Sequence, residues 1–338
     1  MRGRRHHRRR ALLTFDGERR RRAQAANGAP GGTGATTPPW VSWARLVAVI
    51  HDLADDLALA LRLADAADAV SGPAFTGLAV AHELKADGSP VSAADLAVER
   101  RISEIVAAER PGDGVLGEEV GESGPRGRRW IIDGIDGTVL FVDGRRGWAT
   151  EIALEVDGEP VIGVTTAPAD GRRWWAARGA GAWCAATAPG DGTGPDGGGS
   201  DGGGSDGAGS DGAGTDGDTT PVPLHVSATT ALDGGSCSTI PPRAVLVGRS
   251  RGYGDLLAAH ATYVAPHEHG ALFVADGRVD VCLQTGGGPW DFAALSVIVE
   301  EAGGRFSDLH GRRDIYGGGP VVFSNGHVHD ATLAALTA

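Results

Sequence analysis

The sequence predicts an α/β protein of the layered α+β kind, in which helices pack on a largely antiparallel sheet. Apolar residues recur at three- and four-residue spacing in two early segments, a pattern typical of amphipathic helices. Several later segments alternate or run apolar between turn residues, which is typical of strands joined by hairpins. Strand and helix patterns mix again towards the C-terminus, so both halves of the chain contribute to the layers.

Two helices are expected before the sheet. The first runs from Trp40 to about Val70, on the spacing of its apolar residues. The second runs from Ala93 to about Ala108, and the preceding Ser92 has a side chain suited to capping its first turn. A turn at residues 111–114 then leads into a brief strand, Val115–Glu119, which ends in two adjacent acids.

The sheet is expected to continue through the middle of the chain. Trp130–Ile132 is a short apolar strand that enters a loop. The strands Trp148–Val156 and Pro160–Ala167 are separated by Asp157-Gly158, which is a strong hairpin signal. Arg172–Trp183 supplies another strand pair around two glycines.

The second half is expected to contain a mixture of strands and helices. Its last predicted helix stops at Gly303-Gly304, because glycine is the usual residue just beyond a helix C-terminus. The expected strands are Pro223–Val226, Ala244–Gly248 and Val279–Leu283, and the expected helices are Leu256–Thr262, Gly270–Asp276 and Trp290 to about Ala302.

Two segments lack the apolar periodicity that a packed core needs. Residues 1–39 are expected to be a disordered tail, basic and then rich in Gly and Pro. Residues 187–221 are expected to be a flexible acidic insert within a single domain, 40–338, whose two lobes lie at about 40–186 and 222–338. The insert repeats an aspartate every five residues: Asp191, Asp196, Asp201, Asp206, Asp211 and Asp216.

Composition argues against several classes of protein. The net charge of −12 opposes general affinity for nucleic acid. The Arg-rich first 22 residues leave two alternatives open, contact with RNA or another acidic surface and an extension without a role. No apolar run is long enough for a membrane span or for the core of a signal peptide. Three cysteines form no disulfide framework, so a reducing cytoplasm is the expected compartment.

The residues that carry chemistry centre on the segment from Asp133 to Thr138. Asp133 and Asp136 repel one another at a strand end unless a cation lies between them, and Mg²⁺ prefers carboxylate and carbonyl oxygens. The Ile135 carbonyl offers a further oxygen, while the amides of Gly137 and Thr138 suit a phosphate. The alternative for these residues taken alone is an Asp-Gly turn with solvated acids.

Four further acids fit the same site or have purely structural explanations. Glu118 and Glu119 end a strand, where acids are either solvated or bridge metal ions. Asp95 lies in the first turn of a helix, where it favours the helix dipole without any other role. Asp291 lies near the start of another helix and either caps it or faces a metal. A surface or substrate-pocket role is favoured over zinc binding for a separate polar cluster: His267, Glu268 and His269.

Taken in order, these blocks resemble the inositol monophosphatase superfamily of Mg²⁺-dependent, lithium-sensitive phosphatases. The resemblance spans about Trp43 to Ala338 and implies an αβαβα sandwich of the inositol monophosphatase and fructose-1,6-bisphosphatase type. Its motifs are Gly117-Glu118-Glu119, then Asp133 to Thr138, then Trp290-Asp291 before a helix and Gly303-Gly304. Within the superfamily, the chain is most similar to actinobacterial-type histidinol-phosphate phosphatases at residues 85–95, 110–113, 163–183 and 324–329.

The resemblance implies ligands for two to three Mg²⁺ ions. Glu118, Asp133 and the Ile135 carbonyl would hold one ion. Asp133, Asp136 and Asp291 would hold a second, and Glu118 would share a weaker third.

The resemblance also implies a catalytic group of Asp95, Thr138 and Glu118. Within it, Thr138 hydrogen-bonds to Asp95, and the two position the attacking water. Phosphate and substrate contacts are implied for four residues: Gly137, Thr138, Gln284 and Asp291.

The chain departs from the superfamily pattern around its central loop. Gly134 takes the place of a usual proline and is expected to loosen the loop, and Val139-Leu140 replaces a polar pair. Gln284 stands where both inositol and histidinol phosphatases typically carry a glutamate. A neutral amide suits the ammonium group of histidinol less well than a carboxylate does.

The sequence therefore predicts a Mg²⁺-dependent phosphomonoesterase that acts on a small soluble phosphate ester, with histidinol phosphate favoured. Inositol 1-phosphate and 3′(2′),5′-bisphosphate nucleotides are the alternative substrates. A different class also stays open, a weakened member that binds a phosphorylated metabolite without turnover, although the full set of acids favours catalysis. No membrane partner is expected, and a homodimer is the habit of the superfamily.

Overall fold

The structure, a computed structural model, describes residues 43–76, 78–85, 88, 90–187, 219–264 and 269–337. Residues 49–338 form one compact unit, and the described residues 43–48 fall outside it. The expected tail lies outside the described residues, as do residues 188–218 of the expected insert and two members of the polar cluster, His267 and Glu268.

The described part of the chain combines helices with two larger sheets and a small ribbon. None of its helices has the length and apolarity needed to cross a membrane. The helices are α2 (Trp43–Ala74), α3 (Ala93–Glu109), α4 (Thr138–Val142), α5 (Gly248–His260), α6 (Gly270–Ala275), α7 (Pro289–Glu301) and α8 (His329–Thr337), with 3-10 turns η1 (Pro168–Asp170) and η2 (Arg243–Val245).

The eight-stranded sheet is antiparallel except where β3 runs parallel to β5, which agrees with the predicted sheet. Its order is β10 (Val222–Pro223), β9 (Ala182–Ala186), β8 (Arg172–Ala177), β7 (Glu159–Ala167), β6 (Ala149–Val156), β5 (Arg128–Asp136), β3 (Gly114–Gly117) and β4 (Gly121–Ser123). The five-stranded sheet has the order β12 (Thr262–Tyr263), β11 (Ser236–Ile240), β13 (Val281–Gln284), β15 (Val321–Ser324) and β14 (Arg305–Asp308), and the ribbon pairs β1 (His82–Leu84) with β2 (Pro90–Ser92).

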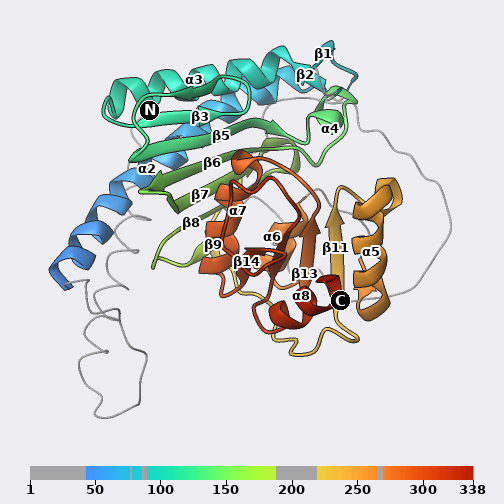
Figure 1. Cartoon of the computed structure of the whole chain (residues 1–338). Helices are drawn as coiled ribbons and strands as arrows, with labels where there is room; N and C mark the ends of the chain where they lie inside the picture. The colour runs from blue at the N-terminus through green and yellow to red at the C-terminus, as the bar shows by residue number, and fades with distance from the viewer. Residues whose placement is uncertain are drawn as a thin grey trace. The chain divides into compact units, whose positions relative to one another are not determined.

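One face of the eight-stranded sheet is covered by α2 and α3 (Figure 1). Leu59 and Leu63 of α2 share a hydrophobic core with Ile102 of α3. The sheet contributes Trp130 and Leu154 to that core, and all five side chains are fully buried. The apolar spacing that predicts the two helices is therefore the spacing that buries them.

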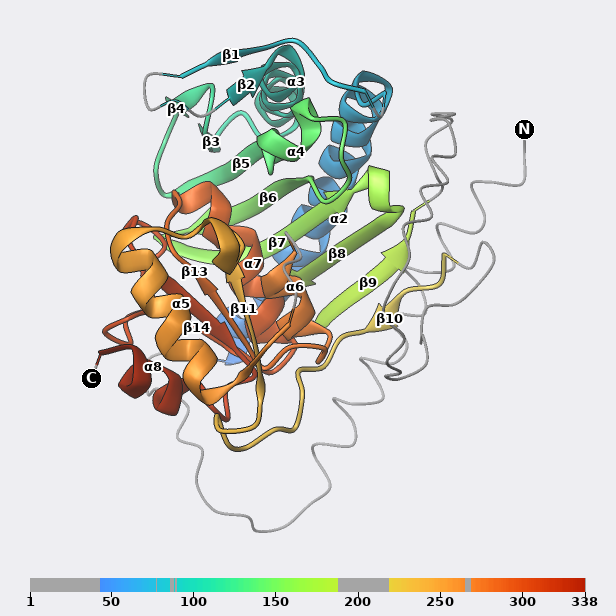
Figure 2. The ribbon, with the colours of Figure 1, turned by 90° about the vertical axis from the view of Figure 1, so that its right-hand side faces the viewer.

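The opposite face of this sheet packs against α6 and α7, which also contact the five-stranded sheet (Figure 2). Every residue of α7 from Phe292 to Val299 is buried, as expected for a helix with a sheet on either side. The outer face of the five-stranded sheet packs against α5 and α8 through residues such as Leu257 and Leu336. The layers run α, β, α, β, α, and the predicted fold class is confirmed.

The contact between α7 and the eight-stranded sheet is close enough to require glycine. A Cβ atom on Gly163 in β7 would lie 2.3 Å from the carbonyl oxygen of Ala294 in α7. No side chain fits in that space, so the backbones of helix and strand pack directly on each other.

The predicted hairpin between β6 and β7 is confirmed. Asp157 and Gly158 both have positive φ angles, 52° and 86°. A two-residue turn of type I′ needs this conformation at both central residues, and Asp-Gly is among the dipeptides that adopt it most readily.

The strand predicted at Ala244–Gly248 is wrong. Residues 243–245 form the 3-10 turn η2, and α5 follows. Val245 and Val247 are 62% and 79% exposed and Leu246 between them is buried, so most of the apolar run that suggested a strand faces solvent. The place beside β13 belongs to β11 instead, whose Ser, Cys and Thr residues carry no strong strand pattern.

Two other predicted elements have different bounds. The helix expected at Leu256–Thr262 is the second half of α5, which begins at Gly248 and ends at His260. Of the strand expected at Pro223–Val226, Pro223 alone lies in a strand, the two-residue β10, which begins one residue earlier at Val222. The glycines in α5 interrupt its helical pattern, and β10 is too short to have a strand pattern of its own.

Candidate metal centre

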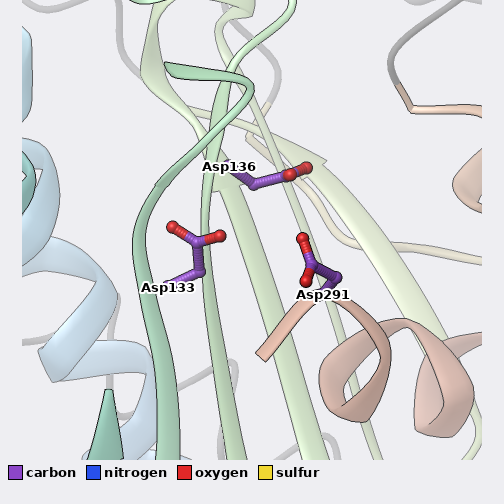
Figure 3. A group of neighbouring side chains, drawn as sticks. All are labelled: Asp133, Asp136 and Asp291. Carbon is purple, nitrogen blue, oxygen red and sulfur yellow. The ribbon is translucent and has the colours of Figure 1, made fainter. Parts of the chain in front are cut away.

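Three aspartates from distant parts of the chain meet at one point (Figure 3). Asp133 and Asp136 belong to the end of β5, and Asp291 belongs to the first turn of α7. One carboxylate oxygen from each lies within 4.8 Å of the other two. A hard divalent cation, with oxygen ligands at about 2.0 to 2.6 Å, fits within a cluster of this size.

A break in the pairing of β5 with β6 explains how two acids three residues apart reach the same cluster. Residues three apart in a regular strand point to opposite faces of the sheet. The pairing shifts register between Asp133 and Asp136, which is the mark of a bulge. Within it, the amide of the fully buried Ile135 donates a hydrogen bond to Asp133 Oδ1 at 2.9 Å. The bulge therefore re-aims Asp136 towards the start of α7.

Asp291 caps its helix and faces the other two aspartates at once. Its Oδ2 accepts a hydrogen bond from the Gly288 amide at 2.5 Å, which satisfies one of the free amides at the helix start. Its carboxylate also points towards Asp133 and Asp136 (Figure 3). The two explanations that the sequence leaves open for Asp291 are thus compatible.

Burial and repulsion between neighbouring carboxylates raise the pKa values of Asp133 and Asp291. Burial is the larger cause at Asp133, whose pKa lies well above its ordinary value, and the charges of Glu118, Asp136 and Asp291 add to it. Burial likewise raises the pKa of Asp291 to about 6, with repulsion from Glu118 contributing. A bound cation stabilises the ionised form of every one of these carboxylates. The residues present therefore fit a divalent metal ion.

A hydrogen bond joins Thr138 to Asp95, as the resemblance implies. The Thr138 hydroxyl lies 3.1 Å from Asp95 Oδ1 and 3.0 Å from the carbonyl oxygen of Ile135. The other oxygen of Asp95 accepts from the amide and the hydroxyl of Ser92, at 2.9 and 2.6 Å. Burial raises the pKa of Asp95, and the hydrogen bonds from Ser92 and Thr138 oppose that rise. Asp95 therefore has both its helix-capping role and a link to the aspartate loop.

Gly134 is closely packed and hydrogen-bonded on both its amide and its carbonyl, whereas the sequence predicts that a glycine here loosens the loop. A Cβ atom at this position would lie 2.5 Å from the carbonyl oxygen of Asp95. The Gly134 amide donates to Glu99 at 3.4 Å, and its carbonyl accepts from the Thr150 hydroxyl at 2.8 Å. Gly137, directly before α4, has a φ of 80°, where glycine is favoured.

Glu118 lies beside the aspartates, in the turn after β3. Its carboxylate forms an ion pair with Lys85 at 2.7 Å, and Lys85 also contacts Glu119. Its charge still reaches the cluster, because it contributes to the raised pKa values of Asp133 and Asp291. The trio of oxygens within 4.8 Å does not include Glu118.

Gln284 is a buried residue at the end of β13, with 5% of its surface exposed. Its Oε1 has no hydrogen-bond partner among the residues that the structure describes. A buried amide oxygen without a partner is costly, so this atom is suited to a donor from a ligand.

His269, the described member of the polar cluster, is buried rather than on the surface. Its Nε2 lies 3.1 Å from Asp170 Oδ2, and its ring packs against Trp174 with 5.5 Å between centroids. Within the described ranges, the group of potential metal ligands found is the aspartate trio, and it excludes His269.

Two buried glutamates, Glu99 and Glu151, are not among the site residues that the sequence predicts. Glu99 of α3 has a pKa raised to about 7, mainly by burial. Glu151 of β6 pairs with Asp133 across the sheet, and burial followed by repulsion from Asp136 raises its pKa well above the ordinary value. The signal for Glu99 is its place four residues after Asp95, on the same face of a helix.

The comparisons with known proteins extend over both parts of the chain that carry the aspartates. The model described as inositol monophosphatase family matches residues 52–195 and 259–338. A histidinol-phosphatase of Mycobacterium tuberculosis is 38% identical over 291 residues, covering 84% of this chain and 98% of that protein. A Streptomyces griseus protein named glucose-1-phosphate thymidylyltransferase is 39% identical over 267 residues, covering 76% of this chain and 86% of that protein.

Solved structures give the same result for the fold. The structure of an inositol monophosphatase from Zymomonas mobilis matches with a TM-score of 0.64 and 27% identity. The match covers 84% of this chain and 98% of that one. The layered fold thus has an experimental counterpart.

Proposed function

Because the chain belongs to the inositol monophosphatase family, we propose that it hydrolyses histidinol phosphate in a Mg²⁺-dependent reaction. The chain is a phosphoric monoester hydrolase, as the family and the histidinol-phosphatases among its relatives indicate. The choice of substrate follows the Mycobacterium tuberculosis relative, which is matched over 98% of its length. The Streptomyces griseus relative is also named for a small phosphate ester.

The observation that carries the proposal is the convergence of Asp133, Asp136 and Asp291 within 4.8 Å. Asp136 and Asp291 are more than one hundred and fifty residues apart in the sequence. An Asp-Gly turn with solvated acids would give no reason for an acid from a distant helix to lie beside it, so the convergence favours a metal site. We assign two to three Mg²⁺ ions to this centre, with Glu118 and the Ile135 carbonyl as further ligands. Repulsion among the buried carboxylates supports the assignment, because it is relieved by a cation.

Bound Mg²⁺ supplies charge neutralisation at the phosphoryl oxygens and makes an attacking water a stronger nucleophile. The chain's own part in that attack falls to Thr138 and Asp95. Thr138 donates its single hydroxyl hydrogen towards Asp95, so its oxygen lone pairs are left to accept a hydrogen bond from the water. Glu118, in the turn after β3, is assigned as the third member of the catalytic group, as the resemblance implies.

Phosphate and alcohol portions of the substrate are assigned to different residues. The amides of Gly137 and Thr138 hold phosphate oxygens, and Asp291 is a further contact that the resemblance implies. Gln284 offers its unpaired buried Oε1 to a donor on the alcohol portion. Histidinol carries such donors in its ammonium and imidazole groups.

A polyol phosphate such as inositol 1-phosphate is the second candidate, and Gln284 favours it. A neutral amide hydrogen-bonds well to a hydroxyl group but lacks the charge that strengthens a bond to an ammonium group. Hydroxyl-bearing substrates therefore lose less than histidinol phosphate does from having an amide at this position.

The test is phosphate release by the purified protein from a panel of monoesters. Histidinol phosphate, inositol 1-phosphate, glucose 1-phosphate and 3′-phosphoadenosine 5′-phosphate are each assayed with Mg²⁺ and with EDTA. We expect release that needs Mg²⁺, with the highest kcat/KM on histidinol phosphate. The Asp133→Asn variant is the matched control for a contaminating phosphatase. Absence of release from every ester overturns the proposed activity, and a preference for inositol 1-phosphate overturns the substrate.

A further inference from the structure

Glu99 is a buried carboxylate that the proposed reaction does not use. It lies in the middle of α3, one helical turn beyond Asp95, and none of its surface is exposed. Burying a carboxylate is costly unless hydrogen-bond donors surround it. The hydrogen-bond donors around Glu99 therefore identify the segments that it positions.

The donors are backbone amides from the two segments that carry proposed metal ligands. Oε2 of Glu99 accepts from the amides of Glu119, at 3.0 Å, and Val120, at 2.8 Å, directly after Glu118. Oε1 accepts from the amide of Gly134, at 3.4 Å, directly after Asp133. A single carboxylate thus links the turn that carries Glu118 to the strand that carries Asp133.

The two segments approach Glu99 so closely that both positions beside it are glycine. A Cβ atom on Gly117 would lie 2.3 Å from Glu99 Oε2. A Cβ atom on Gly134 would lie 3.2 Å from Glu99 Cγ, besides its closer approach to the Asp95 carbonyl. The fit around this side chain is therefore tight on the side of each acid-bearing segment.

We propose that Glu99 is a positioning residue that fixes the distance between Glu118 and Asp133 and so sets the Mg²⁺ affinity of the centre. The proposal rests on the proposed function, because it takes Glu118 and Asp133 as ligands of one ion. Within the described residues, the side-chain hydrogen bonds of Glu99 go to backbone amides, so it acts through the two backbone segments. Loss of a group that orients metal ligands typically costs about 10- to 100-fold in metal affinity.

The variant Glu99→Gln tests the proposal with little change of volume. The glutamine side chain has one acceptor oxygen, so it cannot accept hydrogen bonds from the amides of both segments as Glu99 does. Its NH₂ group is a donor and cannot bond to the amide N–H that faces it. Glu104→Gln is the matched control, because Glu104 is an exposed glutamate on the same helix, paired with Arg101 at 3.4 Å. Mg²⁺ binding is measured by titration calorimetry, together with the Mg²⁺ dependence of phosphate release.

We expect Glu99→Gln to weaken Mg²⁺ binding by about 10- to 100-fold. The kcat at saturating Mg²⁺ and the KM for the ester should change by less than about threefold, because Glu99 does not contact the reacting groups. Glu104→Gln should match the wild type. Equal Mg²⁺ affinity in Glu99→Gln and the wild type, with only a lower Tm, overturns the proposal and makes Glu99 a purely structural residue.

Gly117→Ala keeps the test decisive if Glu99→Gln does not fold. Its added methyl group displaces the Glu99 carboxylate without removing it, and the same loss of Mg²⁺ affinity is expected. An unchanged Mg²⁺ affinity in Gly117→Ala contradicts the proposal. Failure of the wild type itself to bind Mg²⁺ is a different result, which overturns the proposed function and this inference together.

Discussion

Thr138 donates a hydrogen bond to Asp95 at 3.1 Å across forty-three residues of sequence. Asp95 lies in the first turn of α3, and Thr138 is the first residue of α4. The same hydroxyl lies 3.0 Å from the Ile135 carbonyl, so the pair is tied to the loop that carries Asp133 and Asp136. The start of one helix thereby orients a hydroxyl group next to the aspartate cluster.

Replacing Thr138 by valine should lower kcat by about 10²-fold at saturating Mg²⁺, since positioned proton-transfer groups contribute about 10²- to 10⁴-fold. Valine keeps the shape of threonine but removes the hydroxyl that accepts from water and donates to Asp95. Thr138→Ser keeps the hydroxyl group, which has the same hydrogen-bond donor, so its kcat should stay within about fivefold of the wild-type value. Phosphate release measures both variants, and equal kcat for valine and serine contradicts the assigned role.

Asp291→Asn should abolish Mg²⁺-dependent phosphate release while the fold is retained. The asparagine oxygen can still accept from the Gly288 amide, so the cap of α7 survives. The loss of a charged metal ligand should be seen as loss of Mg²⁺ binding in calorimetry, with an unchanged circular dichroism spectrum. Asp330→Asn is the control, because Asp330 is an exposed acid in the first turn of α8. Wild-type activity in Asp291→Asn argues against the metal centre.

The metal-free protein should lose stability as the pH rises from about 6.5 to 8. The pKa of Asp291 is raised to about 6 and that of Glu99 to about 7, both chiefly by burial. A raised folded-state pKa means that the folded protein binds more protons than the unfolded chain, so stability falls as pH rises through the folded pKa. His329 acts in the opposite sense, because burial lowers its pKa to about 4. The gain in stability from His329 with rising pH is nearly complete at pH 6.5, the ordinary pKa of histidine. Above pH 6.5 the change in stability therefore comes mainly from the acids.

The measurement is Tm against pH by calorimetry, with EDTA and with Mg²⁺. The Tm gain from Mg²⁺ should grow with pH, because the ion binds ionised carboxylates. Glu99→Gln should have a shallower fall in EDTA than the wild type, because the pKa of Glu99, about 7, lies within this pH range, whereas that of Asp291, about 6, lies below it. A Tm in EDTA that rises steadily from pH 6.5 to 8 contradicts the assignment of these acids.

Gln284→Glu should shift preference towards a cationic substrate. A carboxylate at this buried position pairs with the ammonium group of histidinol, and a charge-assisted hydrogen bond of this kind is roughly twice as strong as a neutral one. We expect about a tenfold fall in KM for histidinol phosphate and little change for inositol 1-phosphate, a difference of about 1.4 kcal/mol. Gln284→Met, which has no charge, controls for the change in packing. Equal effects on the two esters place Gln284 outside the substrate pocket.

Elements with strong local signals were predictable from the sequence. The cap at Ser92 marks the start of α3, and Asp157-Gly158 marks the turn between β6 and β7. The segment 244–248 was mispredicted because its valines stay exposed, which periodicity cannot reveal. Helix α5, with three glycines in its thirteen residues, has little intrinsic helix propensity and forms through its packing in the tertiary structure.

The aspartates of the site were predictable because they lie in a short, distinctive motif, whereas their supports were not. The position of Glu99 becomes meaningful only when two other segments fold against α3 and present their amides. The pairing of Glu151 with Asp133 likewise depends on strand register, which the sequence leaves open. Lys85 falls within a longer motif, and its ion pair with Glu118 appears only in three dimensions.

The packing of Gly163 against Ala294 has a consequence for the choice of ion. Asp133 and Asp136 lie on the sheet and Asp291 lies on α7, so we expect the gap between sheet and helix to set the spacing of the proposed metal ligands. Mg²⁺ demands oxygens at about 2.0 to 2.1 Å, while Ca²⁺ accepts about 2.3 to 2.6 Å. A methyl group at position 163 would widen that gap and favour the larger ion. We therefore expect Gly163→Ala to lower the preference for Mg²⁺ over Ca²⁺, although Gly163 is not one of the proposed ligands.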